Sequence, residues 1–220
     1  MGLELLATNS CAGKIPAKGW QFLGKGDGLC YNKLKNYVEG CPVELLEKTL
    51  TSQTVFEGKI ITVKLDKALL PNGAQASREV VEHPGGVCIL ALKEDGTVPL
   101  VRQFRYPLGD VMLELPAGKL EYGEQPRPAA IRELGEEVGL EPGELIDLGF
   151  IYVSPGFCTE KLHMYLARNV KSVPVHPDED EFLDIVYLPF EELVEMVMSG
   201  RITDGKTVAT VLKTKVLLAL

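Results

Sequence analysis

The residues from Gly118 to Leu140, GKLEYGEQPRPAAIRELGEEVGL, constrain this chain most, because they join a loop to an acidic helix. Pro126 and Pro128 fit only the first turn of a helix, since proline has no backbone N–H to donate further along. Gly139 suits the position just after the last helical turn, where a left-handed backbone is favoured. The pattern therefore predicts a helix that continues from residue 129 to 138.

Three acidic side chains, Glu133, Glu136 and Glu137, lie on one side of this predicted helix because they are three or four residues apart. Such like charges repel by roughly a few tenths of a kcal/mol per pair, so a cation is expected nearby. Arg132 can pair with Glu136 one turn further along. The remaining carboxylate oxygens suit Mg²⁺ or Mn²⁺, which in turn bind phosphate oxygens. A solvated acidic helix face is the alternative, but it does not account for the spacing.

The full order of residues resembles the signature of Nudix hydrolases at every defining position: Gly118, Glu124, Arg132, Glu133, Leu134, Glu136, Glu137, Gly139 and Leu140. The flanking runs at 78–86, 101–107 and 114–124 look like the ADP-ribose pyrophosphatase branch. The resemblance implies hydrolysis of ADP-ribose to AMP and ribose 5-phosphate with Mg²⁺ as cofactor and Mn²⁺ as the alternative ion. Alternatives are a hydrolase of another nucleoside diphosphate sugar or of NADH, and a Nudix-like sensor that binds ADP-ribose without cleaving it.

The resemblance also implies roles for individual residues. The metal ligands would be Glu133, Glu137, the backbone carbonyl of Ala117 and, directly or through a hydrogen bond, Glu136. Arg132 would orient these groups. The catalytic glutamate would come from the acidic run at 178–181, with Glu181 favoured over Glu179; a plain solvated loop is the alternative for this run.

Further residues match substrate-binding positions of the branch. Arg105 matches a contact to the diphosphate, Glu114 a contact to substrate or a support of the metal site, and Gly118 a point of close backbone approach to the phosphates. Two more, Arg78 and Glu79, match positions on the nucleoside side, and Phe56 is a candidate for stacking on adenine. A surface cation and a core aromatic are the alternatives for Arg105 and Phe56.

Composition excludes several other classes of protein. The 220 residues carry a net charge of −8, which argues against general binding to nucleic acid or to a membrane surface. No apolar run approaches the length of a membrane span. The five cysteines have no CxxC spacing, so neither a zinc site nor a disulfide framework is indicated, and a reducing cytoplasm is expected.

The order of predicted elements favours an α/β fold, a Nudix-type α/β/α sandwich with a mixed β-sheet, preceded by an N-terminal β-hairpin region. We expect an extension at 1–42, strands at 43–86 that serve a homodimer by resemblance to the branch, and a hydrolase domain at 87–220. The extension is a flexible tail, an appendage, or translated sequence upstream of a start at Val43. Besides the acidic helix, helices are expected at 189–199 and 207–220, and strands at 54–56, 60–65, 76–83, 87–92, 98–104, 111–115, 145–154, 162–168 and 182–187.

Overall fold

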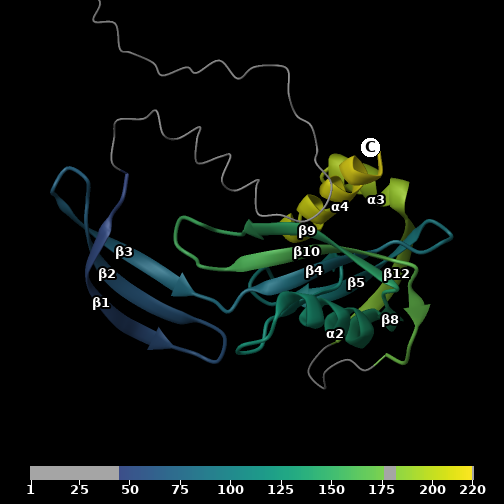
Figure 1. Ribbon diagram of the computed structural model, residues 1–220, viewed down its shortest axis with the longest axis horizontal. Helices are drawn as coiled ribbons and strands as arrows, with labels where there is room; N and C mark the ends of the chain where they lie inside the picture. The colour runs from purple at the N-terminus through teal and green to yellow at the C-terminus, as the bar shows by residue number, and fades with distance from the viewer. Residues whose placement is uncertain (1–44, 176–181, 220) are drawn as a thin grey trace, which may run out of the picture. The chain divides into compact units, whose positions relative to one another are not determined.

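The computed structural model describes residues 45–175 and 182–219 (Figure 1). Within them the chain divides into two compact units. The small unit holds residues 45–48 and 68–76, and the large unit holds residues 49–67 and 77–219. All the predicted site residues that the structure describes belong to the large unit.

The described part of the small unit includes a hairpin turn. The Leu70 N–H donates to the Ala74 carbonyl at 2.8 Å, and the Gly73 N–H donates to the Leu70 carbonyl at 2.9 Å. The Asn72 side chain accepts from the Ala74 N–H at 3.0 Å. These bonds close the turn that Pro71-Asn72-Gly73 predicts.

The strands of the described residues form four sheets. One has the order β1 (Lys48–Glu57), β2 (Thr62–Leu69), β3 (Gln75–Glu82). The second has the order β7 (Ala117–Lys119), β4 (Gly86–Ala91), β10 (Lys161–Arg168), β9 (Glu144–Tyr152). The third has the order β12 (Leu183–Pro189), β5 (Thr97–Arg105), β6 (Asp110–Glu114), and the fourth pairs β11 (Lys171–Ser172) with β8 (Leu140–Glu141). Strands β4 and β10 are parallel, whereas β7 pairs antiparallel with β4 and β9 pairs antiparallel with β10. The second sheet is therefore mixed, as predicted.

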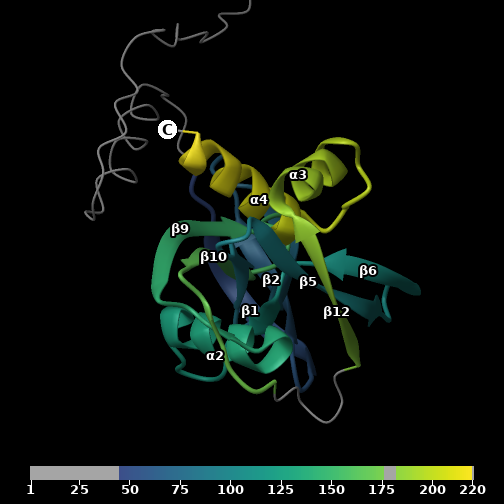
Figure 2. The ribbon, with the colours of Figure 1, turned by 90° about the vertical axis from the view of Figure 1, so that its right-hand side faces the viewer.

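Helices cover both faces of the large unit, as the two views show (Figures 1 and 2). The helix α2 (Pro126–Val138) lies on one face, and α3 (Phe190–Met198) and α4 (Gly205–Leu218) lie on the other. Helices lie on both faces of β4 because the side chains of this strand alternate between two apolar cores. Val87, Ile89 and Ala91 pack in the core that contains α2, whereas Cys88 and Leu90 pack in the core that contains α3 and α4. The predicted α/β/α sandwich is confirmed.

The acidic helix α2 has proline at its start and glycine just after its end, as its sequence predicts. Pro126 and Pro128 occupy its start, and Gly139 ends it in the left-handed conformation with φ 64°. Its apolar side is buried through Ala129, Ala130, Leu134 and Val138. The predicted helix is therefore confirmed, with one additional turn at its beginning.

The last helix begins earlier than predicted, at Gly205 rather than at Thr207, because Asp204 caps it. The Asp204 carboxylate accepts hydrogen bonds from the Thr207 backbone N–H at 3.0 Å and from the Thr207 hydroxyl at 2.6 Å. The same hydroxyl oxygen accepts from the Leu115 N–H at 2.9 Å. The start of α4 is thereby joined to the segment that connects β6 with β7.

The described residues include no helix that combines the length and the apolar composition needed to cross a bilayer.

Candidate active site

Two carboxylates of α2 lie in the protein interior rather than in solvent. Glu133 is 7% exposed and Glu137 is 2% exposed. One oxygen of Glu137 accepts a hydrogen bond from the Ala117 N–H on β7 at 2.9 Å. The Glu133 carboxylate lies so close to Gly118 that a Cβ at this glycine would be 1.9 Å from its carboxyl carbon. The helix and β7 therefore meet through these two glutamates.

Arg132 lies among three carboxylates. Its Nε and Nη2 donate to Glu124 at 3.1 and 3.0 Å, its Nη1 donates to Glu136 at 2.7 Å, and Nη2 is 2.9 Å from a Glu133 oxygen. The hydrogen bonds to Glu124, then the charges of Glu133 and Glu136, raise the pKa of Arg132 above its already high value. The predicted pairing with Glu136 is confirmed. This geometry supports the orienting role that we predicted for Arg132.

Sequence reasoning assigned no role to Glu124, although it is part of the signature. In the structure it holds Arg132 through two bonds and is itself tied to the loop by the Glu121 N–H at 3.0 Å. The hydrogen bonds from Arg132 lower the pKa of Glu124, which keeps it ionised. The signal in the sequence was its fixed place in the signature, eight residues before Arg132.

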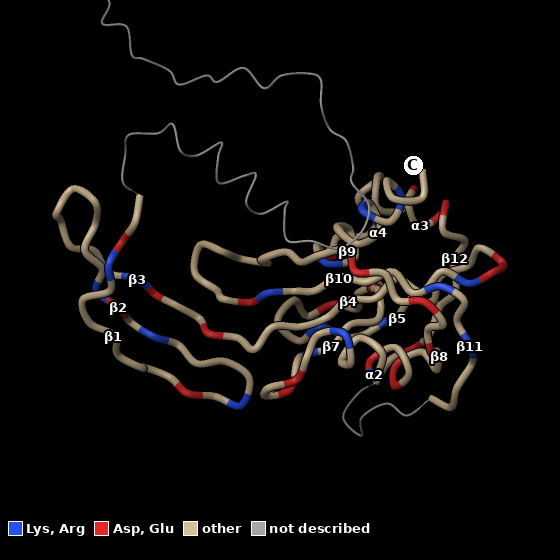
Figure 3. The backbone as a smooth tube through the Cα atoms, in the orientation of Figure 1, with Lys and Arg blue, Asp and Glu red and all other residues tan. Residues whose placement is uncertain are grey.

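The donors around β7 and α2 fit a hard divalent cation, since carboxylate and carbonyl oxygens are the ligands such ions prefer. Figure 3 shows acidic positions on α2 and on the loop before it. Within residues 45–175 and 182–219, however, no three His, Cys, Asp or Glu side chains form a ready metal site. Glu136 instead pairs with Arg132, and Glu137 with Ala117. The predicted ligand set of Glu133, Glu136, Glu137 and Ala117 stays a prediction.

A second ionic cluster joins the end of β6 to the start of α4. Glu114 is only 1% exposed, and its two oxygens accept from Arg105 Nε at 2.8 Å and Nη2 at 2.7 Å. Lys206 also donates to Glu114 and lies 2.9 Å from an Asp204 oxygen. Burial alone would raise the pKa of Glu114, but the hydrogen bonds and charges of Arg105 and Lys206 outweigh it and lower the pKa. Glu114 is therefore ionised in the folded protein.

The remaining predicted residues lie elsewhere. Phe56 is on β1 and is 54% exposed, while Arg78 and Glu79 are on β3. None of these three belongs to either of the two clusters. Glu179 and Glu181 lie outside the described residues, so the predicted catalytic loop stays a prediction.

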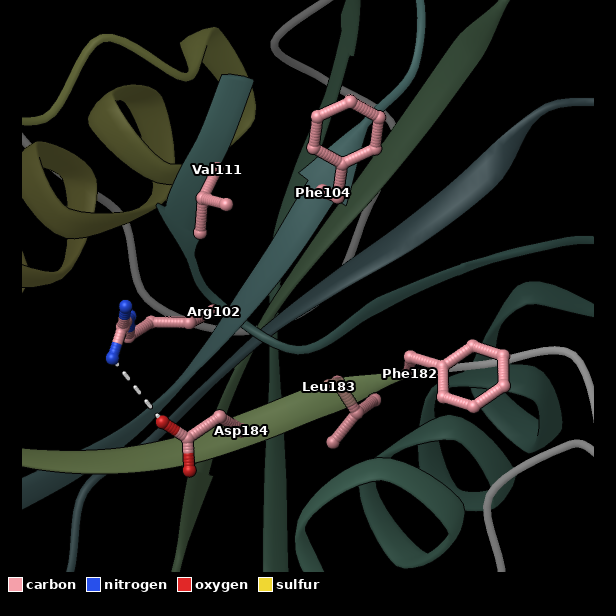
Figure 4. Close-up of a pocket in the computed structure, with 6 residues that line it drawn as sticks. All are labelled: Arg102, Phe104, Val111, Phe182, Leu183 and Asp184. Atoms are coloured by element: carbon pink, nitrogen blue, oxygen red, sulfur yellow. Dashed lines mark hydrogen bonds and ion pairs between the residues drawn. The ribbon is translucent and has the colours of Figure 1, made fainter. Parts of the chain in front are cut away.

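One hollow in the described part of the chain lies away from these clusters. It has a volume of about 470 Å³ and lies on the sheet of β12, β5 and β6. Figure 4 shows Arg102 and Asp184 pointing toward each other there, 3.3 Å apart. Its lining consists of Arg102, Phe104, Val111, Phe182, Leu183 and Asp184. It contains none of the predicted site residues, and we assign it no part in the chemistry.

Comparison with known proteins identifies the class. The NUDIX domain model matches residues 82–211, and the model of the nucleoside diphosphate sugar hydrolase N-terminal domain matches residues 47–81. The chain belongs to the Nudix family, and the resemblance inferred from its sequence is confirmed. Nudix hydrolases generally need a divalent metal ion, which agrees with the oxygen donors around α2.

Individual relatives are also similar to this chain. A methanol dehydrogenase activator from Bacillus methanolicus is 40% identical over 167 residues, which are 75% of this chain and 90% of that protein. An ADP-ribose pyrophosphatase from Bacillus subtilis is 40% identical over 165 residues, 74% of this chain and 89% of that protein. A crystal structure of an ADP compounds hydrolase covers 80% of this chain and 96% of its own with a TM-score of 0.71. At 22% identity, that structure shows the shared fold.

Proposed function

We propose that this protein hydrolyses the diphosphate bond of ADP-ribose, adding water to give AMP and ribose 5-phosphate, with Mg²⁺ or Mn²⁺ as cofactor. The observation that carries the proposal is the pair of buried carboxylates, Glu133 and Glu137, held against β7 within an intact Nudix signature. The choice of ADP-ribose is supported by the relative from Bacillus subtilis.

The metal would be held by Glu133, Glu137 and the Ala117 carbonyl, with Glu136 as a further ligand or support. When bound, it supplies positive charge that offsets the charge of the diphosphate and lowers the pKa of a coordinated water. The chain's own contribution is to fix these oxygens before substrate arrives. Arg132 does this for Glu133 and Glu136, so that little reorganisation is needed during the reaction.

Two other groups of residues complete the proposal. Arg105 binds the diphosphate, because its side chain is 37% exposed and its Nη1 has no hydrogen-bond partner among the described residues. Glu181, or else Glu179, accepts the proton of the attacking water. The nucleoside contacts are proposed for Phe56 on β1 and for Arg78 and Glu79 on β3, all within the region that matches the hydrolase N-terminal domain.

A hydrolase of another nucleoside diphosphate sugar is the second candidate, because the domain description that residues 47–81 match covers this whole substrate class and not ADP-ribose alone. The residues that hold metal and diphosphate would be the same in both cases. Base and sugar contacts would differ, and these depend on loops rather than on the signature. A sensor that only binds ADP-ribose is the third candidate. The complete set of signature glutamates, Glu133, Glu136 and Glu137, argues against it.

A substrate panel separates these candidates. Purified protein with Mg²⁺ or Mn²⁺ is offered ADP-ribose, ADP-glucose, GDP-mannose, NADH and a dinucleoside polyphosphate. Alkaline phosphatase then releases phosphate only from the monoester products. We expect the highest kcat/KM for ADP-ribose, with AMP and ribose 5-phosphate identified by mass spectrometry. A higher kcat/KM for another compound would overturn the choice of substrate, and binding without turnover of any compound would overturn the assignment as a hydrolase. Light scattering of the same sample tests for the homodimer that the resemblance to the branch implies.

A further inference from the structure

Lys206, in the first turn of α4, is a mostly buried lysine that lies between two carboxylates. Its side chain is only 15% exposed, which is unusual for a lysine, and it contacts two carboxylates, Glu114 and Asp204. It lies outside the Nudix signature at 118–140. Burial would lower the pKa of Lys206, but the charges of Asp204 and Glu114 outweigh it and raise the pKa, so the ammonium is charged.

The sharing of Glu114 decides the charge that Arg105 presents. Glu114 carries one negative charge and pairs with two cations, since Arg105 and Lys206 both donate to it. Asp204 also pairs with Lys206 and offsets its charge. The four groups together are neutral, but Arg105 is the member whose side chain is most exposed, at 37%. An anionic ligand that approaches the cluster therefore meets the guanidinium first.

The cluster is also connected to the buried glutamates of α2. The hydrogen bonds to Glu114 are the main cause of the raised pKa of Arg105, and the charges of Asp204 and Glu137 also raise it. In addition, Thr207, next to Lys206, accepts from the Leu115 N–H, two residues before Ala117. The position of α4 thus affects both the guanidinium and the segment that leads into β7.

We propose that Lys206 is a positioning residue for the substrate's diphosphate: by holding Glu114 together with Asp204, it fixes the Arg105 guanidinium and keeps its charge available to the phosphate oxygens. This inference rests on the proposed function, in which Arg105 binds the diphosphate. Without the ammonium, Glu114 and Asp204 are two carboxylates facing one guanidinium, and a diphosphate meets a cluster with a net negative charge.

The test compares the Lys206→Met variant with the wild type in the full-length protein. We expect KM for ADP-ribose to rise about tenfold, a factor that corresponds to 1.4 kcal/mol, with kcat changed less than threefold. The Lys206→Arg variant, which keeps the charge, should bring KM back to within threefold of the wild type. Lys215→Met is the matched control, because Lys215 is on the same helix but pairs with Glu191 in an exposed position, and KM should not change.

Lys206→Met leaves buried carboxylates without their cation, which can impair folding. A second pair of variants therefore tests the same role without this unpaired charge. Asp204→Asn keeps an acceptor for the cap, and adding Lys206→Met to it removes one cation and one anion together. KM for the double variant should exceed that for Asp204→Asn alone by about fivefold or more. Equal KM values in this pair, or a KM for Lys206→Met within twofold of the wild type, would overturn the inference.

A binding measurement separates this inference from the proposed function. Calorimetry with α,β-methylene ADP-ribose and with inorganic pyrophosphate reports Kd without turnover. If the wild type binds the probes but hydrolyses nothing, the proposed function fails, and the ratio of Kd values between Lys206→Met and the wild type still decides the role of Lys206. A ratio near one for both probes would contradict it.

Discussion

Gly118 offers a sharp test of the site, because the space beside it is filled by a single functional group. A Cβ at this position would lie 1.9 Å from the Glu133 carboxyl carbon and 2.0 and 2.3 Å from its oxygens. Ordinary contact begins at 3.4 Å, so the carboxylate has to move by about 1.5 Å, the difference between 3.4 and 1.9 Å. Gly118→Ala thus displaces one predicted metal ligand and little else.

The expected effect on activity is large and the effect on stability is small. A misplacement of about 1 Å at a reacting centre costs on the order of 100-fold in rate, so kcat for Gly118→Ala should fall by about 100-fold or more. The backbone of Gly118 is not in the left-handed region, so alanine itself introduces no strain there. Loss of the partly exposed pair between Arg132 and Glu133 costs up to about 1 kcal/mol, which the lower entropy of the unfolded alanine chain partly offsets.

The assay measures kcat on ADP-ribose, the thermal midpoint, and Mn²⁺ affinity by electron paramagnetic resonance. We expect the midpoint to stay within about 4 °C of the wild type while Mn²⁺ affinity falls. Gly86→Ala provides the contrast, because its Cβ would lie 2.8 Å from the Gly118 carbonyl oxygen, a backbone atom, so this variant should lose stability. A Gly118→Ala protein with wild-type kcat and Mn²⁺ affinity would refute the placement of Glu133 at the metal.

Four other outcomes are expected. The Glu137→Gln variant should keep the fold, since the amide oxygen still accepts a hydrogen bond from the Ala117 N–H on β7. Its kcat should fall by orders of magnitude and its affinity for Mn²⁺ should decrease, and a near-normal kcat would contradict the metal role of Glu137. Arg105→Ala should mainly raise KM, and an unchanged KM in steady-state kinetics would count against the diphosphate contact. Gly135→Ala, which has room for a Cβ, should stabilise α2 by about 1 kcal/mol and raise the thermal midpoint by about 2–4 °C. Because the pKa of Glu114 is lowered in the folded protein, its ion pairs stabilise the fold above the usual pKa of 4.5 and are lost as the pH falls through the lower folded value. The free energy of unfolding of the wild type, measured by urea titration, should therefore decrease below pH 4.5. The Glu114→Gln variant should show a smaller decrease.

Local features of the fold were predictable because they depend on neighbours in the sequence. The acidic helix, its final glycine and the pairing of Arg132 with Glu136 all follow from spacing within two turns of helix. The hairpin turn at 71–73 follows from the residues that favour it. Alternation predicted the strands at 54–56 and 60–65, whereas the apolar run at 87–92 predicted a buried strand. Strand β4 is buried at every position, and its side chains contact a core on each face.

The sequence by itself determined the class of protein, since the order of glutamates, arginine and glycines around α2 sets the chemistry of its site. Only the tertiary structure decided which distant residues pair with the buried polar groups near the site. Glu114 pairs with Lys206, 92 residues further along the chain, and the Leu115 N–H bonds to Thr207 over the same separation. The physical reason is that periodicity encodes which side of an element is buried, whereas the partner that a buried charge finds depends on how distant elements pack.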